Sequence, residues 1–142
     1  MKRVDFYLIA KNLSTHQFAC RLINKAFNSG LTVRVELDTP EQARQLDALL
    51  WEYQSDTFIP HDLGAPTSGA VPSVLISDLP RLAKPADMLL NLRSSTPEPE
   101  QGRAYQRIAE IVPDNPEERE QMRNHFRHYR TLGCTPGYHP IS

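Results

Sequence analysis

Two short apolar runs constrain the fold of this chain more than any other feature of its sequence. Residues 74–76 (Val-Leu-Ile) and 88–92 (Met-Leu-Leu-Asn-Leu) lack a regular alternation of polar and apolar side chains. A strand with one wet face alternates, whereas a strand covered on both faces reads as a continuous apolar run. Both runs therefore predict interior strands of a parallel sheet that carries helices on its two faces.

Strand and helix patterns alternate along the rest of the chain. β-Branched and aromatic residues predict further strands at 4–9, 32–37 and 108–112, the last after a helical turn that begins at Tyr105. Apolar residues at helical spacing predict helices at 15–28, 40–53 and 116–131. Thr39 and Asn115 each precede a proline and suit the cap of a helix, and Gln42 is placed to complete a capping box. Gly133 is placed to end the last helix.

These patterns together predict one α/β domain spanning residues 1–142. Its sheet has roughly five strands, mostly parallel, with helices on both faces, as in a Rossmann-like fold. Proline and glycine punctuate residues 54–72, and residues 94–100 are polar and proline-rich, so both segments read as loops. The tail from 134 to 142 contains two prolines and is expected to be irregular.

The charge balance argues against a direct grip on nucleic acid. The formal net charge is −1, whereas a protein that binds the phosphate backbone shows a basic excess. We therefore expect contact with DNA only through another protein. Asp5 interrupts the first apolar run, no run reaches the roughly 20 residues of a membrane span, and Cys20 and Cys134 have no second pair. These features predict a cytoplasmic protein that does not enter a membrane.

The residues that nucleotide or metal chemistry requires are missing from this pattern. A nucleotide phosphate would bind at the first strand-to-helix turn, but residues 10–14 (Ala-Lys-Asn-Leu-Ser) contain no glycine. His125 and His128 lie three apart on a helix, a spacing that allows two metal ligands, yet no familiar zinc pattern surrounds them. We therefore expect no cofactor, no metal and no enzymatic activity. A small α/β enzyme or nucleotide-binding domain of unknown substrate is the alternative.

The last predicted helix carries an aromatic ring among arginines. At about 100° per residue, four side chains fall within a stripe about 60° wide, namely Arg119, Arg123, Phe126 and Arg130. The predicted core residues lie on another side, namely Met122, Tyr129 and Leu132. The stripe is either a solvated basic face with Phe126 at its edge or a docking groove for an acidic peptide with an apolar anchor. Arginine suits the second interpretation because its planar fork binds carboxylates at two points.

Trp51 is a second candidate for contact with another protein. It is the only tryptophan, it lies off the apolar face of its helix, and Phe58 follows seven residues later. A single tryptophan often marks the edge of a core. Alternatively, Trp51 and Phe58 form an exposed apolar patch of the kind that anchors interfaces.

Six segments form a specific set by their order and spacing: residues 5–8, 45–51, 58–63, 89–93, 112–113 and 129–133. Through them the chain resembles the chi subunit family of the DNA polymerase III clamp-loader complex along nearly its whole length. Residues 64–73 and 94–102 are not typical of the family. The resemblance implies a non-catalytic α/β subunit of the holoenzyme in DNA replication, which pairs one-to-one with the psi subunit. It also implies binding of the acidic C-terminal tail of single-stranded DNA-binding protein, which ends in an apolar residue with a free carboxylate.

The resemblance also assigns residues to these partners. The tail site of the family carries over to Val112, Arg119, Arg123, Phe126 and Gly133. Arg119 and Phe126 stand where the family has a lysine and a tyrosine, so charge and aromaticity are kept but a hydroxyl is lost. Helical geometry adds Arg130 to this set, whereas Val112 joins it only through the resemblance. The psi-facing surface carries over to Trp51 and Phe58.

Overall fold

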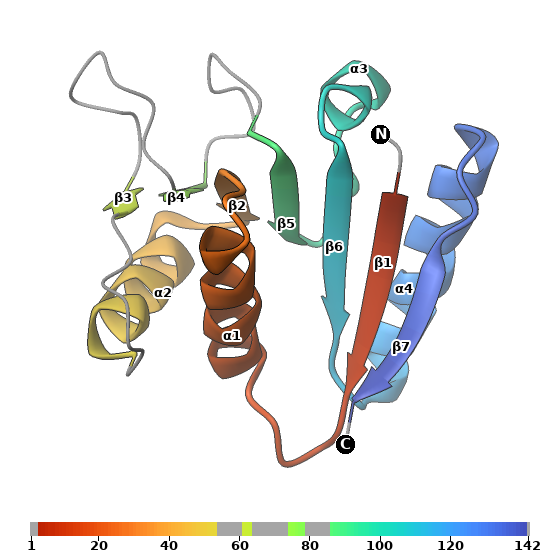
Figure 1. Ribbon diagram of the computed structural model, residues 1–142. Helices are drawn as coiled ribbons and strands as arrows, with labels where there is room; N and C mark the ends of the chain where they lie inside the picture. Colours follow the sequence, from red (N-terminus) through yellow and green to blue (C-terminus); the bar gives the residue numbers. More distant parts are fainter. Residues whose placement is uncertain (1–2, 54–60, 64–73, 79–85, 142) are drawn as a thin grey trace.

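The two apolar runs form strands on either side of a third strand in a computed structural model of the chain (Figure 1). They are β4 (Val74–Ser77) and β5 (Met88–Leu92), and both pair with β2 (Val33–Leu37). Every residue of β4 is buried, and so is every residue of β5 except Leu92, which confirms the prediction that both runs form strands covered on both faces. The structure describes residues 3–53, 61–63, 74–78 and 86–141.

The strands form one open sheet in the order β3-β4-β2-β5-β6-β1-β7. The remaining four are β1 (Arg3–Ile9), β3 (His61–Leu63), β6 (Arg107–Val112) and β7 (Gly137–Ile141). Neighbouring strands run parallel at each junction within the described part of the chain. The predicted single α/β domain is therefore confirmed, with seven strands rather than about five.

The two additional strands correct the sequence analysis at both edges of the sheet. Strand β3 has three residues and lies within the segment 54–72 that was predicted to be mostly loop. Strand β7 lies within the tail that was predicted to be irregular, and it pairs along β1. Pro140 is compatible with this pairing because β7 is an edge strand, and edge strands are where sheets tolerate proline.

Helices cover both faces of the sheet, as expected (Figure 1). Helices α1 (Thr15–Asn28) and α2 (Pro40–Glu52) lie on one face, and α4 (Pro116–Thr131) lies on the other. The short helix α3 (Pro99–Arg103) joins β5 to β6, so the helical turn ends before Tyr105 instead of beginning there. None of the helices in the described ranges is long and apolar enough to cross a membrane.

Side chains alternate along β1 and connect it to two separate cores. Phe6 and Leu8 belong to the core under α4, whereas Tyr7 and Ile9 belong to the core under α1 and α2. Cys20 is fully buried in the latter core, where burial raises the pKa of its thiol to about 11. Cys20 is therefore a core residue, as expected for an unreactive buried thiol.

The predicted caps hold the helices that bear the candidate sites. Thr39 accepts a hydrogen bond from the backbone N–H of Gln42 at 3.1 Å, and the Gln42 side chain accepts one from Asp38 N–H at 3.2 Å. This is one residue before the donor that a regular capping box uses. The Asn115 side chain accepts from the N–H of Glu118 at 2.9 Å and fixes the start of α4. Gly133 ends that helix with φ at 86°, a left-handed conformation that favours glycine.

Candidate docking site on the last helix

Two polar side chains form the centre of the buried side of α4. His125 is 5% exposed and Tyr129 is fully buried, whereas Met122 and Leu132 are partly buried. The prediction that Tyr129 belongs to the core face of the helix is thus correct. His125, which was not predicted for this face, is more deeply buried than Met122 and Leu132. The spacing of His125 four residues before Tyr129 was the available signal, because positions i and i+4 share a helix face.

The predicted arginine stripe lies at the surface of α4. Arg119 contacts Asp114 at 3.3 Å, and Arg123 contacts Glu120 at 2.8 Å with both side chains 62% exposed. Arg130 is also exposed. Exposed ion pairs of this kind stabilise a fold by only about 0.2–1 kcal/mol, so an incoming anion can replace them at little cost.

Phe126 lies at the boundary between the arginines and the core. Its ring is partly buried and packs on Phe6, with 5.7 Å between the ring centroids. Beside it, α4 and β7 enclose an open cavity of about 370 Å³ lined by Met122, Arg123, Phe126, Arg127 and Tyr138. Its walls are almost entirely apolar although two of its residues are arginines, and it is large enough for one apolar side chain.

The structure does not place every predicted tail-site residue on this cavity. Arg123 and Phe126 line it, and Arg119 and Arg130 continue the same stripe along the helix. Val112 is 4% exposed, belongs to the core under α4, and lines a different cavity. Gly133 follows the end of the helix and is exposed.

The cavity also contains residues that the sequence analysis missed. Arg127 and Tyr138 line it but were not predicted as site residues. Arg127 lies about 80° from Arg119 around the helix, just outside the predicted stripe. Tyr138 was missed because β7 was expected to be irregular.

Trp51 lies at the surface near the end of α2. It is 58% exposed, and Leu63 on the edge strand β3 is 40% exposed. Helix α2 packs against β3, so both apolar side chains belong to the same end of the sheet. Phe58, the other predicted psi-facing residue, lies outside the described residues.

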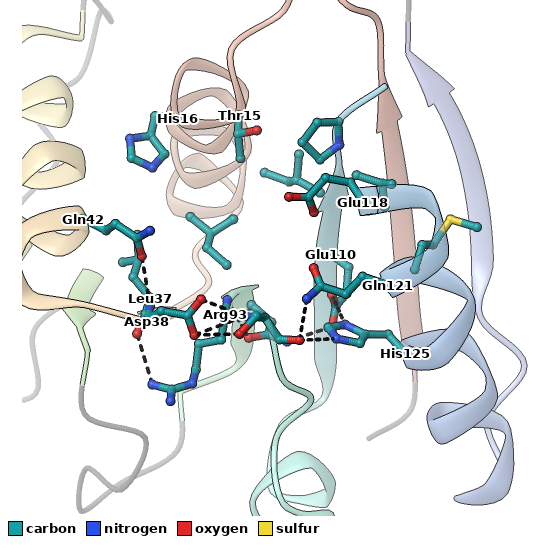
Figure 2. Close-up of a pocket in the computed structure, with 17 residues that line it drawn as sticks. Thr15, His16, Leu37, Asp38, Gln42, Arg93, Glu110, Glu118, Gln121 and His125 are labelled. Atoms are coloured by element: carbon teal, nitrogen blue, oxygen red, sulfur yellow. Dashed lines mark hydrogen bonds and ion pairs between the residues drawn. The ribbon is translucent and has the colours of Figure 1, made fainter. Parts of the chain in front are cut away.

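A second cavity lies on the other side of α4, at the carboxyl ends of the central strands (Figure 2). Its volume is about 320 Å³ and its lining is mainly polar. This edge of a parallel sheet is where α/β proteins commonly bind ligands. Here Asp38 accepts a hydrogen bond from Ser94 N–H at 3.0 Å, and Gln121 donates one to the Ser94 carbonyl at 2.8 Å. The polar groups of this edge thus hold residue 94 of the chain between the turn that precedes α2 and helix α4.

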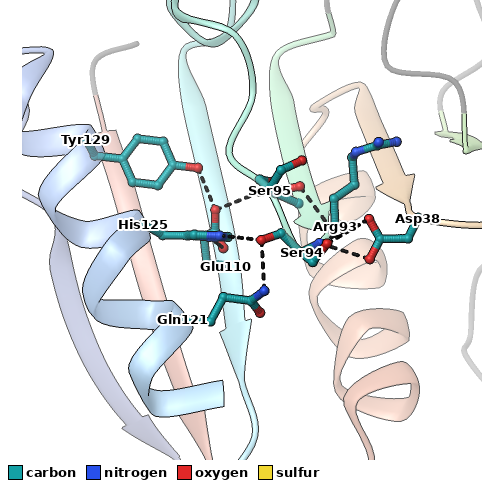
Figure 3. Close-up of polar contacts among 9 residues, drawn as sticks. Asp38, Arg93, Ser94, Ser95, Glu110, Gln121, His125 and Tyr129 are labelled. Carbon is teal, nitrogen blue, oxygen red and sulfur yellow. Dashed lines mark hydrogen bonds and ion pairs between the residues drawn. The ribbon is translucent and has the colours of Figure 1, made fainter. Parts of the chain in front are cut away.

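A buried carboxylate organises the polar contacts behind that cavity (Figure 3). Glu110 accepts hydrogen bonds from Asn91 at 2.8 Å and from the Tyr129 hydroxyl at 2.5 Å, and its other oxygen lies 2.8 Å from His125 Nδ1. His125 Nε2 lies 2.9 Å from the Ser94 carbonyl oxygen. Burial and the Glu110 carboxylate raise the pKa of the Tyr129 hydroxyl, which therefore stays protonated as a donor.

These contacts bear on the metal site that the two histidines suggested. Both ring nitrogens of His125 are occupied by protein acceptors, so the ring has no lone pair directed at a metal. His125 is 5% exposed and belongs to the buried side of α4. Across the described ranges, no group of three or more His, Cys, Asp or Glu side chains is arranged to hold a metal ion.

Comparisons with known proteins agree on one family. The family described as DNA polymerase III chi subunit, HolC, matches residues 1–137. The chain is similar to DNA polymerase III subunit chi of Pseudomonas aeruginosa, with 34% identity over 94% of this chain and 92% of the relative. It is also similar to the protein of that name in Haemophilus influenzae, with 27% identity over 93% of this chain and 92% of the relative. The protein of that name in Escherichia coli shows 26% identity over 94% of each chain.

A match of this extent covers both candidate surfaces, α4 with its arginines and the end of α2 with Trp51. It supports a role in DNA replication within a polymerase complex. The chain therefore belongs to the DNA polymerase III chi subunit family.

Proposed function

We propose that this chain is a cytoplasmic, non-catalytic adaptor of the DNA polymerase III holoenzyme. It pairs with the psi subunit through Trp51 and Phe58. It binds the acidic C-terminal tail of single-stranded DNA-binding protein along α4, and it contacts DNA only through that partner.

The observation that carries the tail-binding proposal is that Arg123 and Phe126 line one surface cavity. The tail presents several carboxylates and one apolar side chain next to a free terminal carboxylate. Arg119, Arg123 and Arg130 offer the opposite charge, and the Phe126 ring offers an apolar contact. Charge and apolar surface thus occur side by side on both partners.

The same geometry predicts a modest, salt-dependent affinity. Arg123 is 62% exposed. Salt weakens the attraction between exposed charges, and at physiological ionic strength this attraction is largely screened beyond about 8–10 Å. A two-point grip of a guanidinium on the terminal carboxylate contributes more than a single charge contact. We therefore expect tail binding to weaken as salt rises without being lost at once.

The decisive experiment is fluorescence anisotropy with a labelled peptide of aspartates that ends in phenylalanine. Arg123→Glu should abolish measurable binding at low salt because it removes the central cation and adds a like charge. Arg44→Glu is the matched control, since Arg44 is exposed on α2, on the opposite face of the sheet. If Arg123→Glu binds as tightly as the wild type at low salt, α4 is only a solvated face.

The non-catalytic part of the proposal rests on two features of the chain. The turn at residues 10–14 has no glycine to approach a phosphate, and the polar groups at the carboxyl edge bond to the chain itself. Calorimetric titration with ATP, GTP and NAD checks this expectation. Stoichiometric binding of any of them would favour the alternative of a nucleotide-binding domain.

A further inference from the structure

Strand β7 presents an aromatic side chain to the cavity on α4. Tyr138 is 54% exposed and lies opposite Phe6 in the register between β1 and β7. Phe6 in turn packs on Phe126, so three rings follow one another from β7 across β1 to α4. Tyr138 bounds the cavity on the side away from the helix, where the arginine stripe offers no apolar surface.

The opposite face of β7 is held to β1 by a polar contact. His139 Nε2 lies 2.8 Å from Asp5 Oδ1, and the His139 ring stacks on Tyr7 with 5.1 Å between centroids. This contact passes directly over Gly137, where a Cβ would lie 2.7 Å from Asp5 Oδ1 and 3.1 Å from His139 Nε2. Because successive side chains of a strand point to opposite faces, fixing His139 also fixes the direction of Tyr138.

We infer that β7 is a specificity element of the docking site: Tyr138 forms the outer wall of the pocket for the peptide's terminal apolar side chain, and His139 with Asp5 positions that wall. Arg123 and Arg127 are among the residues that line the same cavity, so a carboxylate next to the terminal side chain lies within reach of two arginine side chains. This inference rests on the tail-binding function proposed above.

The test compares two labelled aspartate peptides, one ending in phenylalanine and one ending in alanine, on the full chain. Tyr138→Ala should weaken the phenylalanine-ended peptide about tenfold, because part of its apolar contact is lost. The same change should leave the alanine-ended peptide within about twofold, because only residues that share a contact are coupled. Tyr138→Phe keeps the ring and should bind both peptides like the wild type.

His139 is tested as a positioning residue by the same selectivity. His139→Ala should reduce the preference for phenylalanine over alanine, and His139→Gln should restore part of it, because its amide can still donate to Asp5. A fully structural role for His139 would weaken both peptides equally, which would overturn the positioning claim.

The outcomes separate this inference from the function on which it rests. If Tyr138→Ala leaves both peptides unchanged, or weakens them equally, while Arg123→Glu loses both, docking stands and the assignment of β7 is wrong. If the wild-type chain binds neither peptide, the docking function itself is overturned, and the pocket with it. A thermal midpoint within a few degrees of the wild type shows that each variant is folded.

Discussion

The Glu110 carboxylate and the His125 imidazole form a buried pair, with 2.8 Å between Oε1 and Nδ1. The other ring nitrogen of His125 faces the Ser94 carbonyl oxygen at 2.9 Å. Both neighbours are acceptors, so both nitrogens donate only when the ring is an imidazolium. Burial alone lowers the pKa of His125, but the hydrogen bond to Glu110 and the charge of its carboxylate outweigh burial and raise this pKa above its ordinary value.

The raised pKa makes a pH-dependent contribution to stability. It is fully present below the unfolded pKa of about 6.5 and is lost as pH rises through the higher folded pKa. We expect His125→Gln to lower the free energy of unfolding by about 3–5 kcal/mol at acidic pH, because the Glu110 carboxylate loses its cationic partner and keeps the neutral donors Asn91 and Tyr129. The loss should shrink at pH values above the folded pKa.

Urea denaturation of both proteins over a pH series measures this difference. His128→Gln is the control, since His128 lies one helical turn from His125 and has no contact with Glu110 among those described. A stability difference for His125→Gln that stays constant with pH would show that the ring is not an imidazolium in the folded state.

The sequence predicts most of the sheet because its central strands have a strand-like local pattern and are also buried by the elements that pack on them. Residues 74–76 form a continuous apolar run, and Val33, Val35 and Leu37 alternate with two charged residues in a strand that is buried at every position. Strand β7 has no such local pattern, since its five residues include Gly137 and Pro140. Its position depends on pairing with β1 and on the contact of His139 with Asp5, which are 134 residues apart. No local rule detects a partner at that distance.

The candidate site also contains residues that the sequence predicts and residues that only the tertiary structure places. Helical periodicity alone brings Arg119, Arg123 and Phe126 to one side of α4. The apolar wall that completes the cavity comes from Tyr138, on an element outside that helix. Val112 is a separate case, because the resemblance assigned it to the site and the structure places it in the core. Side chains on one helix are predictable, whereas the surface that faces them requires the tertiary structure.

Gly137 provides a second test of how β7 is held. Gly137→Ala should lower the free energy of unfolding by about 1–3 kcal/mol, because its Cβ would lie 2.7 Å from Asp5 Oδ1. Gly102→Ala is the matched control, since the nearest atom to its Cβ would be 3.5 Å away, an ordinary contact. Thermal unfolding of both variants measures the difference. Equal midpoints would mean that β7 adjusts without strain and that its contact with β1 is loose.

Trp51 should be an interface residue rather than a core residue. Because its side chain is 58% exposed, Trp51→Ala should leave the thermal midpoint nearly unchanged. The same substitution should weaken psi binding at least tenfold, because truncating an aromatic anchor typically costs about 2–4 kcal/mol at an interface.

Tyr53→Ala is the contrasting variant, since Tyr53 packs against the core under α2 and its loss should lower the midpoint. Surface plasmon resonance with immobilised psi gives the affinities, and calorimetry gives the midpoints. A large loss of stability in Trp51→Ala would identify Trp51 as part of the core and would contradict its role as an anchor.

Glu120 should compete with the docked tail for Arg123. The two side chains are 2.8 Å apart and equally exposed, so a peptide carboxylate that binds Arg123 must displace the Glu120 carboxylate. Glu120→Gln removes this competitor and one negative charge near the acidic peptide. We expect affinity to rise about two- to fivefold at low salt, which corresponds to an exposed pair of about 0.4–1 kcal/mol.

The gain should disappear at high salt, because screening weakens the competing pair and the repulsion alike. Glu117→Gln makes the same charge change about 120° away from Arg123 around α4 and serves as the control. Anisotropy titrations of the phenylalanine-ended peptide at two salt concentrations compare the variants. If Glu117→Gln raises affinity as much as Glu120→Gln, the effect is one of net charge, and Arg123 is not held by Glu120 in the free protein. A gain confined to Glu120→Gln would instead mean that breaking a local ion pair on α4 accompanies docking.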